Sequence, residues 1–209
     1  MSRRPAPPPR TPDSPVLGVV CFEGQWSTDI RDQQTVQPVL ELLQRSGWIR
    51  FLHRFVSSEQ QLRAELRQWA QKRNSSYELC YIACHGAPGA VHLGDGVVVP
   101  AGTIAGWLAG RLQGRTVYFG ACSVAKDTGD VVDVLKAFKR TTKARAVCAY
   151  TNDIEWLESA AFEILLLSTI GWYSRRGMPW AFRYLDENYG DMVERLGFTS
   201  VPASARARG

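Results

Sequence analysis

Short apolar runs alternate with helical patterns along most of the chain, and this alternation is the strongest constraint on its fold. Five runs are expected to be strands: residues 16–22, 49–56, 77–84, 116–122 and 145–150. A continuously apolar run such as the first suits a strand that is covered on both faces. The alternation therefore predicts an α/β domain with a mostly parallel sheet and helices on both faces, in three layers.

The predicted helices lie between these strands and after the last one. Most are recognised by apolar residues that recur at helical spacing, and some also by a capping residue. They cover residues 36–43, 58–69 with Ser58 as N-cap, 104–112, 130–138 with Asp130 as cap, 155–171, and 186–196 with Gly197 as C-cap. A hairpin is expected over residues 91–99, with its turn at Gly94–Gly96.

The length of 209 residues suits one domain with a buried core. The composition, 45% hydrophobic and 22% charged, is that of a globular protein. We place this domain at residues 16–198. Residues 1–15 are basic and rich in proline and are expected to form a disordered tail, and residues 199–209 a flexible basic tail.

The charge distribution argues against a nucleic-acid partner. The net charge is +5, but the two predicted tails carry +2 each, which leaves +1 on the domain. A nearly neutral domain has no basic footprint for phosphates. The most apolar segment, residues 164–173, is half of the roughly 20 residues that a membrane span needs, so no membrane insertion is expected. Five irregularly spaced cysteines without a secretory signal predict reduced thiols and a cytoplasmic protein.

Two residues with catalytic chemistry stand at the ends of predicted strands. His85 ends the third strand and Cys122 ends the fourth, 37 residues later. In parallel sheets, active groups gather at the carboxyl ends of the strands, so the two side chains are expected to meet there. A thiolate is a strong nucleophile, and an imidazole can protonate the leaving amine and then assist water. The backbone N–H groups of Gly86 and Cys122 are the candidates for an oxyanion hole.

The motifs around these residues resemble a known family. YIACHG at residues 81–86, the hairpin after it, and TVYFGACS at residues 116–123 are similar to the caspase-like fold, closest to its bacterial CHAT-domain branch. The resemblance covers residues 16–173. It implies a cysteine endopeptidase that needs no metal or organic cofactor and cuts a protein or peptide substrate in a bacterial defence or cell-death system. A regulatory partner protein is a further implication.

The chain also departs from caspases themselves. Caspases have Gln-Ala-Cys at the nucleophile and the histidine about 50 residues upstream. Here Gly120 stands in place of the glutamine, and the separation is 37 residues. Cleavage after aspartate is therefore not implied.

The resemblance also suggests a substrate pocket built from loops. Asp29 and Asp32 follow the first strand, and Asp153 follows the fifth, so an acidic pocket for a basic residue is one hypothesis. Alternatively, Asp153 is an N-cap and Asp29 shapes a turn. Trp26 is either an aromatic wall for the substrate or a lid residue.

Other interpretations of these residues stay open. Cys122 could be a small buried hydrophobe, and the whole domain a catalytically silent module for protein–protein interaction. A zinc site at Cys80, Cys84, His85 and His92 is disfavoured, because Cys80 and Cys84 would lie about 13 Å apart on a strand. A nucleotide- or flavin-binding domain is also disfavoured, because no glycine-rich phosphate fingerprint follows the first strand.

Overall fold

The computed structural model describes residues 16–126, 134–173 and 178–202, and these form an α/β domain. Six strands make the main sheet: β1 (Leu17–Glu23), β2 (Ile49–Phe55), β3 (Leu79–Ala83), β7 (Thr116–Gly120), β8 (Ala146–Tyr150) and β9 (Phe198–Val201). The helices are α1 (Gln37–Arg45), α2 (Glu59–Trp69), α3 (Ala101–Trp107), α4 (Val134–Thr142), α5 (Trp156–Tyr173) and α6 (Met178–Arg195), with a 3-10 turn, η1 (Lys72–Asn74).

The order of strands in the sheet is β2-β1-β3-β7-β8-β9. All neighbours are parallel except β8 and β9. The chain moves from β1 outward to β2 and then returns to β3 on the other side of β1, which makes β1 and β3 the topological switch point. Loops that leave the carboxyl ends at such a point diverge and leave a crevice.

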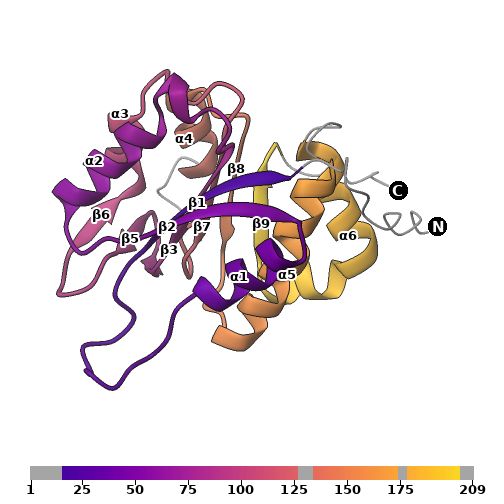
Figure 1. Cartoon of the computed structure of the whole chain (residues 1–209), viewed down its shortest axis with the longest axis horizontal. Helices are drawn as coiled ribbons and strands as arrows, with labels where there is room; N and C mark the ends of the chain where they lie inside the picture. Colours follow the sequence, from indigo (N-terminus) through magenta and orange to yellow (C-terminus); the bar gives the residue numbers. More distant parts are fainter. Residues whose placement is uncertain (1–15, 127–133, 174–177, 203–209) are drawn as a thin grey trace.

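Helices cover both faces of this sheet, and each face has its own core (Figure 1). One core joins alternate strand residues to α1, α5 and α6, and the other joins the opposite residues to α2, α3 and α4. Strands β3, β7 and β8 are buried at every position because both of their faces are covered. The predicted fold class, an α/β domain in three layers with a mostly parallel sheet, is confirmed.

A small antiparallel sheet follows His85. It consists of β4 (His85–Ala87), β5 (Ala90–His92) and β6 (Val98–Pro100), in that order. The turn between β5 and β6 has positive φ at Gly94, Asp95 and Gly96, and the Val97 N–H donates to the Gly94 carbonyl. The predicted hairpin is therefore confirmed, and it fixes the backbone that leaves His85.

The end of the chain differs from its prediction. Residues 199–202 are not part of a tail, because β9 pairs with β8 from Phe198 to Val201 and closes that edge of the sheet. Helix α6 begins at Met178 rather than at Asp186, and Tyr189 interrupts it with φ −134° and ψ 28°. The prediction, residues 186–196, covered only the second half of this helix. The predicted tails at residues 1–15 and 203–209, and Asp130 as the cap of α4, lie outside the described residues.

Candidate active site

Three neighbouring strands deliver the candidate catalytic residues to one edge of the sheet. Strands β1, β3 and β7 are adjacent and parallel, so their carboxyl ends lie together. Trp26 follows β1, His85 follows β3, and Cys122 follows β7. The register sets Ala83 beside Gly120, which leaves each candidate residue two positions beyond this pair.

The backbones that carry His85 and Cys122 are in direct contact at Gly86. A Cβ on Gly86 would lie 2.2 Å from the Cys122 carbonyl oxygen and 2.9 Å from the Cys122 nitrogen. Only a residue without a side chain permits this approach. His85 and Cys122 accordingly line the same cavity.

A backbone carbonyl orients the His85 ring. The ring nitrogen Nε2 lies 2.6 Å from the Trp26 carbonyl oxygen. A carbonyl oxygen can only accept, so Nε2 carries the proton, and Nδ1 is the basic nitrogen of the neutral ring. The indole of Trp26 also meets the imidazole edge to face, with the ring centroids 5.3 Å apart.

A buried carboxylate, Glu23, holds the loop that bears Trp26. Its Oε1 accepts hydrogen bonds from the Trp26 indole (2.5 Å) and the Val36 N–H (2.9 Å). Its Oε2 accepts a hydrogen bond from the Thr35 hydroxyl (2.8 Å) and is hydrogen-bonded to His53 Nε2 (2.5 Å). Burial alone would raise the pKa of Glu23, but these four hydrogen bonds outweigh burial and lower it. Glu23 therefore ties both ends of the loop between β1 and α1 to the sheet.

Cys122 differs from the other four cysteines in its exposure. Cys21, Cys80, Cys84 and Cys148 are buried, whereas Cys122 is half-buried. Burial raises the pKa of all four buried thiols, that of Cys84 to about 12. These four cysteines fill the two cores. The Cys122 Sγ is 3.9 Å from the Ile154 carbonyl, which is a weak contact for a thiol donor.

The turn after Cys122 is fixed by Asp153. Ser123 has φ of 56°, which is uncommon for a residue with a side chain. Its hydroxyl donates to Asp153 Oδ1 (2.6 Å), and its N–H donates to the Asn152 carbonyl. Asp153 is not the cap of α5, because Glu155 accepts from the Glu158 N–H there. Asp153 thus supports the turn after Cys122 and does not line the cavity beside Cys122.

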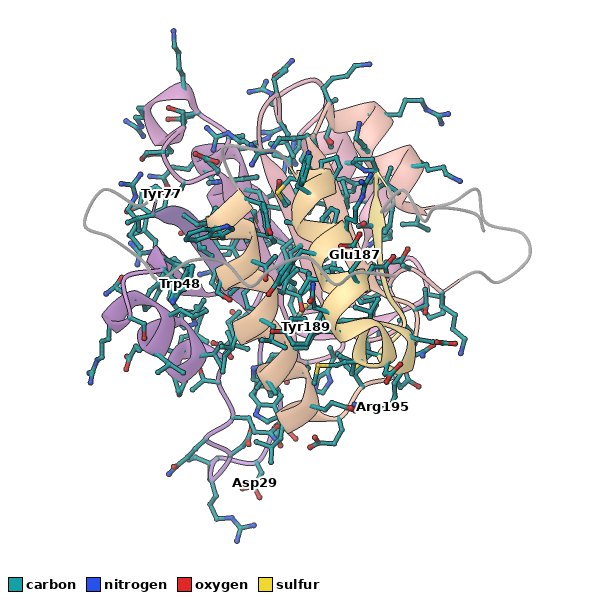
Figure 2. All side chains as sticks on the ribbon, turned by 90° about the vertical axis from the view of Figure 1, so that its right-hand side faces the viewer. Asp29, Trp48, Tyr77, Glu187, Tyr189 and Arg195 are labelled. Carbon is teal, nitrogen blue, oxygen red and sulfur yellow. The ribbon has the colours of Figure 1, made fainter. Side chains whose placement is uncertain are left out.

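The two aspartates of the first loop lie apart from the candidate catalytic residues. Asp29 stands at the end of the loop that extends from the body of the domain, where it pairs with Arg31 (Figure 2). The Arg31 hydrogen bonds lower the pKa of Asp29. Asp32 lines a separate, open cavity. Of the four residues predicted for the substrate pocket, only Trp26 lines the cavity of His85 and Cys122.

The cavity beside Cys122 has a volume of about 360 Å³ and is largely apolar. Loop residues and the first turns of α1 and α5 form its walls, and Tyr81, Gly120 and Glu163 contribute from the sheet and from α5. The apolar and aromatic wall residues are Trp26, Val36, Pro38, Val39, Ile154, Trp156 and Leu157.

Glu163 is the acidic residue that lines this cavity, and sequence reasoning did not assign it a role. It is 3% exposed, and its Oε1 accepts from the hydroxyls of Tyr81 (2.6 Å) and Tyr118 (3.1 Å). The hydroxyls of Tyr118 and Tyr150 are also hydrogen-bonded to each other (2.7 Å). Burial raises the pKa of Glu163 to about 7, although both tyrosine bonds act in the opposite direction. A Cβ on Gly120 would lie 2.2 Å from the Tyr81 ring, so glycine is needed there.

Among the described residues, no group of three histidine, cysteine, aspartate or glutamate side chains is placed to hold a metal ion. Likewise, none of the described helices is long and apolar enough to cross a membrane. Glu23 and Glu163 were missed as site residues because each stands alone in an apolar segment. A charged residue inside a strand or helix that is otherwise buried is the signal that would have found both.

Residues 17–199 match the family model of DUF6642, which is described as a family of unknown function. The chain belongs to this family. No curated protein matches it. Among solved structures, it is similar to caspase-1 from Spodoptera frugiperda, with a TM-score of 0.48 and 13% identity over 81% of this chain and 74% of that chain.

Proposed function

We propose that the protein is a cysteine peptidase that hydrolyses peptide bonds in a partner protein, with Cys122 as nucleophile and His85 as general acid and base. The observation that carries this proposal is the contact of Gly86 with the Cys122 backbone, together with the shared cavity of the two side chains. A thiol, an imidazole and a cavity for an acyl group are the parts that acyl transfer to cysteine requires.

The steps assign each proton to a named atom. His85 Nδ1 takes the Cys122 proton, and the thiolate attacks the substrate carbonyl. The imidazolium then gives the proton to the leaving amine, and a thioester remains on Cys122. In the second half, His85 Nδ1 takes a proton from water, and the water oxygen attacks the thioester carbon. The C–S bond then breaks, the acid leaves, and the proton on Nδ1 returns to the Cys122 sulfur.

Trp26 orients the ring of His85, and Glu23 holds Trp26 in place through its indole N–H. The Trp26 carbonyl accepts from Nε2 and so keeps Nδ1 free as the base. When His85 becomes an imidazolium, the same carbonyl stabilises its charge. The N–H groups of Gly86 and Cys122 remain our proposal for the oxyanion hole, since small residues leave room for a substrate carbonyl beside them.

Alkylation with iodoacetamide, followed by intact-mass analysis, tests the nucleophile. The four buried cysteines are an internal control, because burial slows their reaction, and we expect one label, on Cys122. The substitution His85→Ala should slow this labelling at neutral pH by about 10-fold or more, because the pairing with imidazole is lost. A rate that does not depend on His85 would favour a catalytically silent module.

Cleavage itself is tested by co-expression with proteins encoded nearby. Wild type and Cys122→Ala are compared by mass spectrometry of those proteins. A fragment that appears only with wild type would identify the substrate and the bond that is cut. The CHAT-branch assignment and a role in defence also depend on that substrate.

A further inference from the structure

Glu163 is a buried carboxyl group, and no lysine or arginine among the described residues pairs with it. It lines the cavity beside Cys122, and both tyrosine hydroxyls donate to one of its oxygens, Oε1. No donor from the described residues reaches Oε2. The described cavity lining contains no lysine or arginine, and its one basic side chain is His85. A buried carboxylate is costly unless it is paired, so a cation from outside would relieve an existing penalty.

Besides His85 in the cavity lining, the described titratable groups that interact with Glu163 include no lysine or arginine. They come from four strands and are Cys21 and Glu23 on β1, Tyr81 on β3, Tyr118 on β7 and Tyr150 on β8. The thiol and the three phenols are neutral near pH 7, because burial raises each pKa further. Glu23 is negative and adds to the potential that favours a cation at Glu163.

The walls suit the rest of a long basic side chain. Lysine and arginine carry apolar stems below their charged groups, and such stems pack on apolar surface. Trp26 and Trp156 meet edge to face with their centroids 4.6 Å apart, and both line the cavity. Indole faces attract cations, and guanidinium stacks on them most readily.

We propose that this cavity binds an arginine or lysine side chain of the peptide substrate, with Glu163 as the residue that pairs with its charge. The proposal rests on the proposed peptidase function and adds the substrate class. Because the cavity is lined by Cys122 and His85, the side chain it binds belongs to the residue at the scissile bond. Glu163 is thus a specificity-determining residue on α5, not on the loops that carry Asp29, Asp32 and Asp153.

The test uses peptidyl acyloxymethyl ketones that differ only in the residue next to the reactive group: arginine, citrulline, lysine or norleucine. Citrulline has the shape of arginine without its charge. The rate of Cys122 modification is measured by intact mass. We expect wild type to react at least about 10-fold faster with arginine than with citrulline, as hydrogen bonds to charged groups predict. Lysine should exceed norleucine in the same way.

Two variants assign the preference to Glu163. Glu163→Gln keeps the shape and an acceptor for the tyrosines, and it should reduce the arginine-to-citrulline ratio to about one. Glu194→Gln is the matched control: Glu194 is exposed on α6 and lines no described cavity, so the ratio should equal that of wild type. If Glu163→Gln fails to fold, the arginine-to-citrulline ratio of wild type still tests whether the cavity prefers a charged side chain.

The dependence on pH gives an independent readout. Because the pKa of Glu163 is raised to about 7, the carboxylate forms above that pH and is neutralised below it. The arginine-to-citrulline ratio in wild type should therefore be larger near pH 8 than near pH 6. The ratio cancels any effect of pH on the nucleophile itself, since both reagents react with the same Cys122.

The failure of this proposal is separable from that of the proposed function. Equal rates for arginine and citrulline, with labelling by iodoacetamide that depends on His85, would overturn the basic pocket alone. A ratio that Glu163→Gln leaves unchanged would do the same. Loss of the His85 dependence would overturn the peptidase, and the ratio would then report on the cavity by itself.

Discussion

Replacing Glu163 by glutamine should stabilise the protein at high pH, and the size of the effect follows from its environment. The pKa of this carboxyl is raised from 4.5 to about 7 by burial. At about 1.4 kcal/mol per pKa unit, this shift corresponds to about 3 kcal/mol. Glutamine has no charge to bury and keeps an oxygen that can accept from Tyr81 and Tyr118.

The sign follows from proton binding. Between about pH 4.5 and pH 7, the folded protein holds a proton on Glu163 that the unfolded chain has lost. The folded state thus binds more protons, and the stability of wild type falls as pH rises through this range. The penalty is small near pH 4.5 and complete above pH 7. Most of it, about 2 kcal/mol, develops between pH 5 and pH 8.

Urea unfolding of wild type, Glu163→Gln and Glu194→Gln at about pH 5 and pH 8 measures this effect. The advantage of Glu163→Gln over wild type should grow by about 2 kcal/mol between the two pH values, or about 4–8 °C in Tm for a domain of this size. A hydrogen bond lost in the variant would lower its free energy of unfolding by the same amount at both pH values. The difference between the two pH values would therefore be unchanged. A difference that is constant with pH, or that has the opposite sign, would refute a buried carboxyl with a raised pKa.

Two further substitutions test the geometry around His85. Gly86→Ala should slow iodoacetamide labelling of Cys122 by about 100-fold, because the added Cβ would collide with the Cys122 backbone and displace it. The control is Gly106→Ala in α3, where the added Cβ meets open space. This variant should leave the labelling rate unchanged and stabilise the helix by about 0.5–1 kcal/mol. Equal labelling rates for the two variants would contradict the contact between Gly86 and Cys122. Glu23→Gln should lower the free energy of unfolding by about 3 kcal/mol, measured in urea near pH 7, because the imidazole of His53 and three other donors lose a charged partner. An unchanged midpoint would mean that Glu23 does not hold the loop.

The pattern of apolar runs was enough to predict the layers and most strands. Strands β1, β3, β7 and β8 are buried on both faces, and such strands appear in a sequence as continuous apolar runs. The edge strand β9 was missed because three of its four residues are partly exposed and the buried one is Ser200, so little hydrophobic signal distinguishes them from a tail. Its place depends on hydrogen bonds to β8, which is about 50 residues away in the chain.

The sequence by itself determined that His85 and Cys122 stand at strand ends. Each residue lies at the end of an apolar run, and a small residue, Gly86 or Ser123, comes directly after it. It did not determine which acidic group lies in their cavity. The family resemblance suggested the aspartates of the loops, whereas Glu163 reaches the site from the second turn of a helix.

Only the tertiary structure brought Glu23 and Glu163 to the surroundings of the two candidate catalytic residues. Their positions depend on the packing of α5 and of the first loop against the carboxyl ends of β1, β3 and β7. Periodicity records which face of an element is apolar, but it does not record which elements meet across that face. The burial that raises the pKa of Glu163 exists only after those elements have packed.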